Sequence, residues 1–188
     1  MFNTVLWLVV AAFPTSEIVL ALFKRSDSRS AQPEDRGSMR LLWLAITLGV
    51  AAAIAVAPMR AFRLPFPGDI VRALGVAVLA GGLVLRWVSI VTLGRLFTVD
   101  VAIQQNHSLV ERGPYRFVRH PSYSGLLVAF LGLGLFYVNW LSLLVLMVPV
   151  TLAVINRIAR EEQALVAALG PAYSAYCSRT KRLFPSLF

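Results

Sequence analysis

The chain has 188 residues, of which 58% are hydrophobic and only 14% are charged, and its formal net charge is +9. A soluble domain carries about 25% charged residues, so this composition excludes an ordinary water-facing surface and indicates an integral membrane protein. A high positive charge can mark nucleic-acid binding, but here the basic residues lie in short segments between apolar stretches, as membrane insertion requires, and we expect no nucleic-acid partner. With one cysteine and two histidines, an intrachain disulfide is excluded and no metal site is expected.

Five apolar stretches predict an all-α protein with five transmembrane helices, folded as a single membrane-embedded domain over residues 1–188. The first stretch lacks a basic residue before it and is followed by Lys24 and Arg25, so we interpret it as a retained helix and not as a signal peptide. The five expected spans are residues 2–23, 41–57, 70–93, 123–138 and 141–155.

The last two stretches are short, because a spanning helix needs about 20 apolar residues. A single helix over both would be about 50 Å long, well beyond a hydrocarbon core of about 30 Å. We therefore predict a tight helical hairpin that turns at Asn139 and Trp140, with Tyr137 and Trp140 as interfacial aromatic residues.

The distribution of lysine and arginine predicts the orientation of the chain. Fourteen of these residues lie in segments 24–40, 94–121 and 157–188, whereas only three lie on the opposite side, Arg60, Arg63 and Arg72. Cytoplasmic loops are enriched in lysine and arginine, so we expect the N-terminus outside and the C-terminus in the cytoplasm. In a bacterium this would be the inner or plasma membrane.

Two ionisable residues, Glu17 and Arg86, fall inside the first and third apolar stretches. Glu17 lies seven residues before Lys24 and Arg86 lies seven residues before the end of the third stretch, so both are expected at about the same depth. Charges within a membrane are costly and are normally paired or functional. The pattern leaves three interpretations open: an ion pair between the two helices, separate snorkelling to the interface, or contact with a substrate or cofactor.

The segment that precedes the fourth span contains both histidines and a turn signal at Gly113-Pro114. Pro121 fits the first turn of the following helix, because its missing N–H would have no partner there in any case. His120 is thus expected at a helix N-terminus on the membrane surface. Free N–H groups and the positive end of the helix dipole suit an anionic group at such a place.

The segment after the last span is expected to continue as a helix, in which Arg157 and Glu161 are i, i+4 neighbours and Glu162 follows. One interpretation is a self-paired surface helix, stabilised by a few tenths of a kcal/mol. The other is a site that faces the basic, histidine-containing loop. Gly170-Pro171 is expected to end this helix, and the basic-aromatic tail beyond it suits a membrane surface.

These residues resemble the isoprenylcysteine carboxyl methyltransferase family, which is related to phospholipid methyltransferases. The resemblance covers residues 97–184, and two of its elements, RHPxYxG and R-x-x-x-EE, are specific when they occur in this order around a hydrophobic hairpin. The matching motifs are His107-Ser108-Leu109-Val110, Gly113-Pro114-Tyr115-Arg116, residues 119–125 and residues 157–162.

The resemblance implies an S-adenosylmethionine-dependent methyltransferase that binds its cofactor between the bilayer surface and the C-terminal helix, through segments 97–125 and 157–185. In that family Arg157 corresponds to an arginine that faces the substrate, and we take it as the catalytic residue. The glutamates are expected to bind the cofactor's ammonium, and the helix end at His120 is expected to bind its carboxylate. Tyr123 is expected to lie near its sulfonium. The implied cofactor residues are Gln104, His107, Ser108, Leu109, Val110, Tyr115, His120, Pro121, Ser122, Tyr123, Glu161 and Glu162.

Residues Gly132-Leu133-Gly134 are similar to a cofactor glycine motif of related phospholipid methyltransferases. Small residues inside a span more often allow helices to pack closely, and we interpret these two glycines in that way.

The methyl acceptor stays open at the level of sequence. We expect a lipid-like or prenylated substrate that enters from the bilayer, with carboxyl O-methylation of an isoprenylcysteine-type acceptor as the first hypothesis. A carboxylate is ionised at neutral pH and needs no general base, and Arg157 would orient it in a bidentate manner. Phospholipid N-methylation and O-methylation of a phenolic or quinone lipid are the alternatives, and these require a base such as His107, His120 or a glutamate. A non-enzymatic membrane assembly or transport subunit is an alternative of another class.

Overall fold

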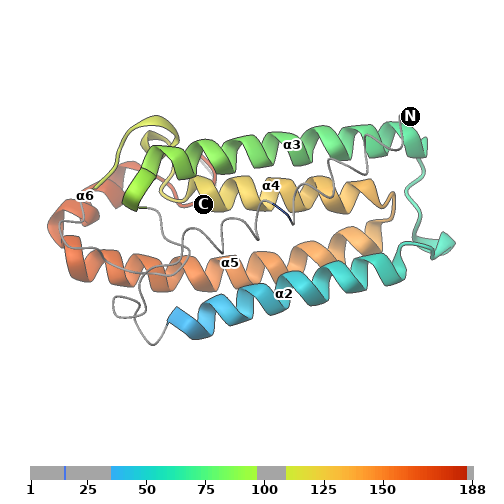
Figure 1. The fold of residues 1–188 in the computed structure, drawn as a ribbon, viewed down its shortest axis with the longest axis horizontal. Coiled ribbons are helices and arrows are strands. Elements are labelled where there is room, and N and C mark those ends of the chain that lie inside the picture. Colours follow the sequence, from blue (N-terminus) through green and yellow to red (C-terminus); the bar gives the residue numbers. More distant parts are fainter. Residues whose placement is uncertain (1–14, 16–34, 97–108, 186–188) are drawn as a thin grey trace.

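The computed structural model describes Thr15 and residues 35–96 and 109–185, and these form an all-helical bundle (Figure 1). The helices are α2 (Asp35–Val56), α3 (Gly68–Leu93), α4 (Pro121–Phe136), α5 (Trp140–Leu169) and α6 (Pro171–Arg179). Three short 3-10 turns connect them: η1 (Arg60–Phe62), η2 (Gly94–Leu96) and η3 (Gly113–Arg116).

Three of these helices are long and apolar enough to cross a membrane, namely Gly37–Val56 within α2, α3 and α5, and α4 is a shorter apolar helix. The predicted fold class is therefore confirmed, and helices occupy four of the five predicted stretches. The first, residues 2–23, lies outside the described residues apart from Thr15. The fourth has the predicted length but is shifted by two residues, because α4 begins at Pro121 and ends at Phe136; its 16 residues extend only about 24 Å.

Helix α5 continues well past its predicted span and ends at Gly170, whose positive φ of 53° suits glycine. Its 30 residues extend about 45 Å, so the polar part beyond residue 155 projects out of a hydrocarbon core of about 30 Å. The predicted continuation of the helix and its stop at Gly170-Pro171 are both confirmed.

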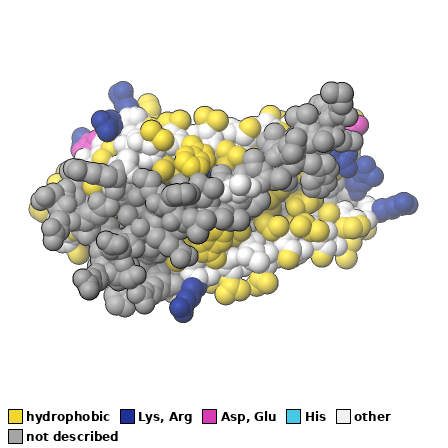
Figure 2. Space-filling model, viewed as in Figure 1, with side chains coloured by type: hydrophobic (Ala, Val, Ile, Leu, Met, Phe, Trp, Pro, Cys, Tyr) yellow, Lys and Arg dark blue, Asp and Glu magenta, His cyan; other side chains and the backbone are white. Residues whose placement is uncertain are grey.

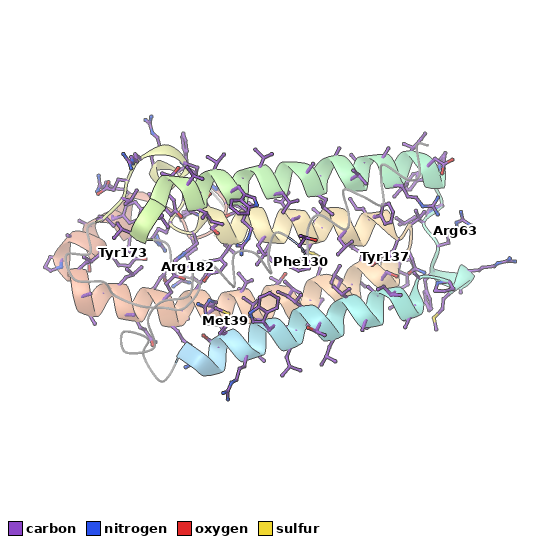
Figure 3. All side chains as sticks on the ribbon, in the orientation of Figure 1. Met39, Arg63, Phe130, Tyr137, Tyr173 and Arg182 are labelled. Carbon is purple, nitrogen blue, oxygen red and sulfur yellow. The ribbon has the colours of Figure 1, made fainter. Side chains whose placement is uncertain are left out.

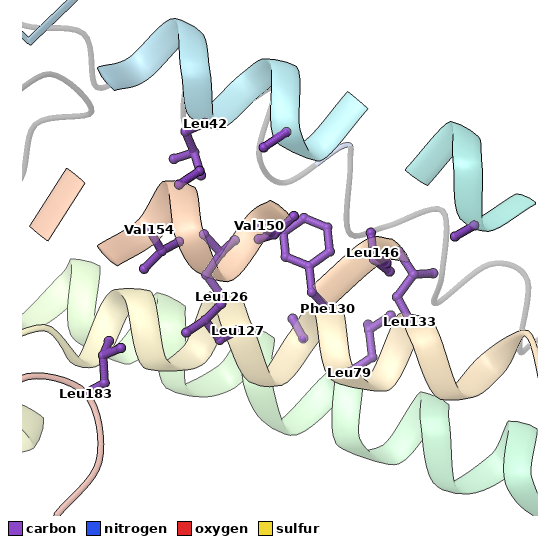
Figure 4. Packing of buried hydrophobic residues seen from close by; sticks show 14 of the residues in the cluster. Leu42, Leu79, Leu126, Leu127, Phe130, Leu133, Leu146, Val150, Val154 and Leu183 are labelled. Carbon is purple, nitrogen blue, oxygen red and sulfur yellow. The ribbon is translucent and has the colours of Figure 1, made fainter. Parts of the chain in front are cut away.

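The bundle consists of two antiparallel helix pairs, α3 with α4 and α2 with α5, joined by contact between α4 and α5 (Figure 1). A cluster of buried apolar side chains fills the space between the pairs (Figure 4), with Phe130 of α4 close to Val150 of α5. Large apolar side chains such as Leu48, Val84 and Leu152 are exposed on the outside, and most of the coloured side chains on the visible face are hydrophobic (Figure 2). Such an exterior suits lipid.

Small residues spaced seven apart bring α3 and α4 into backbone contact. A Cβ atom added at Gly75 would lie 2.7 Å from the carbonyl oxygen of Gly132, and one added at Gly82 would lie 2.7 Å from that of Gly125. Lipid tails are as apolar as leucine, so helices in a membrane associate largely through such close packing. The interpretation of Gly132 and Gly134 as packing residues is confirmed, since Gly134 abuts Leu143 of α5.

The predicted hairpin between α4 and α5 is confirmed, but it turns at Tyr137-Val138-Asn139, slightly before the predicted Asn139-Trp140, because Trp140 already begins α5. The Asn139 side chain accepts hydrogen bonds from the N–H groups of Leu141 and Ser142 at the start of α5. It also donates to the carbonyls of Val56 and Met59, at 3.2 Å each. One side chain thereby satisfies backbone groups at the start of α5 and at the end of α2.

The close approach of α3 and α4 generates a prediction with a matched control. Gly82→Ala should destabilise the protein by about 1–3 kcal/mol, because its new methyl group meets backbone that cannot rotate away. Gly81→Ala should leave stability unchanged or slightly higher, because no atom lies within 4 Å of a Cβ atom there. Thermal unfolding of the two variants in detergent measures the difference, and equal melting temperatures would contradict this packing.

Candidate active site

The polar residues singled out in the sequence lie together at one end of the bundle, which we call the site end. It is formed by η3, the start of α4, the part of α5 beyond residue 155, α6 and the tail at residues 180–185. Figure 3 shows Tyr173 of α6 and Arg182 of the tail at this end, whereas Arg63 and Tyr137 lie at the opposite, hairpin end.

The tail runs back beside the start of α4 and is held there by backbone hydrogen bonds. The N–H of Arg119 donates to the carbonyl of Lys181 at 2.8 Å, and the N–H of His120 donates to that of Arg182 at 2.9 Å. The hydroxyl of Ser124 donates to the Leu183 carbonyl. The tail is thus part of the site end.

These bonds change the expectation for the N-terminus of α4. The N–H of His120 is occupied by the tail, and those of Tyr123 and Ser124 donate to the carbonyl of His120 at 3.0 and 3.1 Å. The prediction of free N–H groups is therefore wrong for these three residues. The physical reason is that the first turn closes on the carbonyl of His120, while the tail takes the N–H of His120.

The carboxylate of Glu162 forms a partly buried charge cluster with basic residues from two other segments. It lies 2.9 Å from Nε of Arg119, 2.8 Å from a terminal nitrogen of Arg182 and 3.4 Å from Nε2 of His120, and its side chain is 12% exposed. Burial alone would raise the pKa of Glu162, but hydrogen bonds from His120, Arg182 and Arg119 outweigh burial and hold that pKa at about 2. The carboxylate is therefore ionised at neutral pH.

Glu161 has different surroundings, although it is the next residue. Its side chain is 29% exposed, and one oxygen accepts a hydrogen bond from the hydroxyl of Tyr123 at 2.9 Å. Among the described residues, His120 is the only basic side chain within 4.0 Å of this carboxylate, at 3.9 Å. The negative charge of Glu161 is thus far less compensated than that of Glu162.

Arg157 is buried between three helices, with 2% of its surface exposed. Its Nε donates to the hydroxyl of Tyr123 at 2.8 Å, and a terminal nitrogen donates to Ser38 of α2 at 3.1 Å. The interpretation as a self-paired surface helix is therefore wrong for Arg157. Because the Tyr123 hydroxyl accepts from Arg157 and donates to Glu161, these two residues are linked through a side chain of α4.

Arg86 of α3 is also buried, and its guanidinium donates to the carbonyl and the hydroxyl of Ser122 at 3.3 and 3.1 Å. Snorkelling to the interface is thus contradicted for Arg86. The predicted pair with Glu17 lies outside the described residues. Ser122, which the resemblance implies as a cofactor residue, is a contact of Arg86 in this structure.

The remaining predicted cofactor residues fall into three groups. Gln104, His107 and Ser108 lie outside the described residues, and Leu109 and Val110 are half-buried just before η3. Tyr115 of η3 and Pro121 of α4 are buried at the site end. The structure thus brings together Tyr115, His120, Pro121, Ser122, Tyr123, Arg157, Glu161 and Glu162.

Sequence reasoning missed several residues that organise this end. Arg119 and Arg182 hold Glu162, Ser38 holds Arg157, and the hydroxyl of Tyr176 donates to the carbonyl of Tyr115 at 2.5 Å. Arg119 is the first residue of the recognised RHPxYxG element and Arg182 lies in the basic tail, and these positions were the available signal. Ser38 lies 119 residues from Arg157 in the chain, and nothing in its surroundings marks it.

Comparison with known proteins identifies the relatives of this chain. A model of the isoprenylcysteine carboxyl methyltransferase family matches residues 73–167. Protein-S-isoprenylcysteine O-methyltransferase B of Arabidopsis thaliana is 30% identical over 182 residues, which cover 94% of this chain and 89% of that protein. Protein-S-isoprenylcysteine O-methyltransferase of Schizosaccharomyces pombe is 30% identical over 147 residues, covering 71% of this chain and 62% of that protein.

A solved structure also matches, that of the eukaryotic intramembrane Ras methyltransferase isoprenylcysteine carboxyl methyltransferase without a monobody. Its TM-score is 0.58 at 23% identity, and the match covers 83% of this chain and 53% of that one. This likeness shows the fold, and the chain spans about half the length of that enzyme.

The contrast between the two glutamates generates a prediction. Glu162→Gln should destabilise the protein by roughly 3 kcal/mol, because it removes the charge that compensates the buried guanidinium of Arg119. It should also accelerate tryptic cleavage after Lys181 and Arg182. Glu161→Gln should leave the cleavage rate unchanged, because Glu161 does not hold the tail. Mass spectrometry of timed digests measures both variants, and equal rates would contradict the role of Glu162 in fixing the tail.

Proposed function

Because the chain belongs to the isoprenylcysteine carboxyl methyltransferase family and is thus a membrane-embedded methyltransferase, we propose that it methylates the carboxylate of an isoprenylcysteine-type lipid acceptor with S-adenosylmethionine. The proposed site is the site end, with the acceptor entering from the bilayer. We further propose that residues 1–188 act as one domain.

The observation that carries this proposal is the difference in charge compensation between Glu161 and Glu162. Two arginines neutralise Glu162, whereas Glu161 has no arginine within 4.0 Å among the described residues. A partly exposed carboxylate of this kind fits the cationic amino group of the cofactor. We therefore propose Glu161 as a cofactor contact, and we reassign Glu162 to positioning Arg119 and the tail.

Arg157 suits a role in orienting the acceptor. A buried guanidinium in a low-dielectric setting attracts an anion strongly, and its planar group can bind a carboxylate through two hydrogen bonds. Its bonds to Tyr123 and Ser38 restrict its rotation. An amine acceptor would be cationic and would be repelled here, so the position of Arg157 favours a carboxylate.

The surroundings of the candidate general bases also favour a carboxylate acceptor. An amine or phenol acceptor requires one, but His120 is 4% exposed and its Nε2 lies 3.4 Å from Glu162, within the charge cluster. Glu162 is held by Arg119 and Arg182. His107 lies outside the described residues. A carboxylate acceptor needs no base at neutral pH, so the engagement of His120 and Glu162 in the charge cluster is compatible with it.

Bound S-adenosylmethionine supplies an activated methyl group, so the task of this chain is to align the acceptor and exclude water. Alignment of two reactants in a near-attack geometry can be worth about 7–11 kcal/mol. Glu161 would attract the cofactor's ammonium, and Arg157 would direct the acceptor oxygen. The hydroxyl of Tyr123 contacts both side chains and would keep their separation constant.

We also propose that the site end faces the cytoplasm and that the N-terminus lies outside. The support is the excess of lysine and arginine in segments 24–40, 94–121 and 157–188 over the three arginines at the hairpin end. Water-soluble cofactor would then reach the site from the cytoplasm while the lipid-linked acceptor stays in the bilayer.

The division of roles between Glu161 and Arg157 can be tested by two substitutions. Glu161→Ala should abolish binding of S-adenosylhomocysteine, because the charge that attracts its ammonium is lost. Arg157→Ala should retain that binding and lower kcat at least about 100-fold, because the acceptor is no longer oriented. Isothermal titration calorimetry and steady-state kinetics with a small S-prenylcysteine acceptor separate the two effects. Normal affinity in the Glu161→Ala variant would refute its assignment.

The identity of the product tests the acceptor. With radiolabelled cofactor and lipid extracts, the product should release methanol in base, because methyl esters hydrolyse there and methylamines and phenyl ethers do not. Label that remains bound to lipid after base treatment would instead support N-methylation or phenolic O-methylation.

A further inference from the structure

One buried hydroxyl at the site end has no partner. Tyr173 of α6 is 2% exposed, and its hydroxyl makes no hydrogen bond with any group in the described part of the chain. It is the only buried side-chain nitrogen or oxygen among the described residues in this condition. Buried polar groups are almost always hydrogen-bonded, and leaving one unsatisfied costs free energy. Such a group indicates a site that a ligand completes.

The neighbouring tyrosine on the same helix shows that burial by itself does not leave this hydroxyl unsatisfied. Tyr176 lies one turn further along α6, is 3% exposed and has its ring centre 6.1 Å from that of Tyr173. Its hydroxyl donates to the carbonyl of Tyr115. Two phenols on one helix are thus equally buried, but only Tyr176 has a partner in the protein.

The electrostatic surroundings of Tyr173 indicate which ligand group it would meet. Burial raises the pKa of the Tyr173 hydroxyl, and the charge of Glu162 raises it further. The guanidinium of Arg119, which binds Glu162, also donates to the carbonyl of Cys177 of α6 at 3.1 Å, so α6 packs against the segment that carries both glutamates. Arg119 and Arg182 compensate Glu162, which leaves Glu161 as the less compensated charge. Figure 3 places Tyr173 at the same end of the bundle as Arg182. A cation drawn to Glu161 would therefore approach an unused phenol oxygen.

We propose that the hydroxyl of Tyr173 is a further cofactor contact, which accepts a hydrogen bond from the ammonium group that Glu161 attracts. An ammonium carries three N–H donors, so one carboxylate cannot satisfy it alone. A phenol oxygen offers the additional acceptor without adding a second uncompensated charge. This contact rests on the proposed function, since it requires that S-adenosylmethionine binds at the site end.

Tyr173→Phe tests the proposal, because it removes only the hydroxyl and keeps the buried ring. The variant should bind S-adenosylhomocysteine about tenfold more weakly than the unsubstituted protein. Its affinity for 5′-methylthioadenosine should be unchanged, because that nucleoside lacks the amino-acid end of the cofactor. The melting temperature without ligand should stay equal or rise, because no hydrogen bond within the protein is lost.

Tyr176→Phe is the matched control on the same helix. It removes a hydroxyl that is bonded to the Tyr115 carbonyl, so it should lower the melting temperature without ligand. The two tyrosines are thus expected to change stability in opposite directions or by clearly different amounts.

Three results would overturn the contact: equal affinity of the Tyr173→Phe variant and the unsubstituted protein for S-adenosylhomocysteine, equal weakening for both ligands, or a lower melting temperature of the unliganded variant. The last would show that the hydroxyl has a partner within the protein. If the unsubstituted protein binds no S-adenosylhomocysteine, the proposed function fails and this contact with it. If it binds and the variant binds equally well, only the role of Tyr173 fails.

Discussion

The partly buried ion cluster around Glu162 joins segments that are far apart in the chain and determines the shape of the site end. Its carboxylate, at the polar end of α5, holds Arg119 at the start of α4 and Arg182 in the tail. When a charge pair is shielded from water, separating its partners leaves an uncompensated charge and destabilises the protein. These segments are therefore expected to stay together. The tail in turn occupies the N–H of His120 and closes the end of α4.

The same cluster explains why two adjacent glutamates differ in chemistry. Successive residues of a helix point about 100° apart, so Glu162 faces the arginines while Glu161 faces Tyr123. The Tyr123 hydroxyl then links Glu161 to the buried guanidinium of Arg157. In the proposed reaction, this chain of contacts would set the distance between the cofactor's amino group and the acceptor carboxylate. Disturbing Tyr123 would then affect both ligands.

The apolar bundle supports this arrangement through backbone contact between α3 and α4. Glycines at residues 75, 82, 125 and 132 let the two backbones approach more closely than side chains would permit. Arg86 of α3 therefore reaches the first turn of α4, where it binds Ser122. At the hairpin end, Asn139 joins the ends of α2 and α5. Rigid packing of the helices thus fixes the positions from which the site residues project.

The sequence by itself determined the class of the protein, the hairpin at Asn139 and the stop at Gly170, because composition and local backbone preference depend only on neighbouring residues. Its motifs also identified the residues that gather at the site end. Only the tertiary structure decided which contacts each of these residues makes. The partners of Glu162 lie 43 and 20 residues away, and Ser38 lies 119 residues from Arg157. Hydrogen bonds and charge compensation act through space over a few ångströms, and no spacing in the sequence encodes which distant residues come within that range.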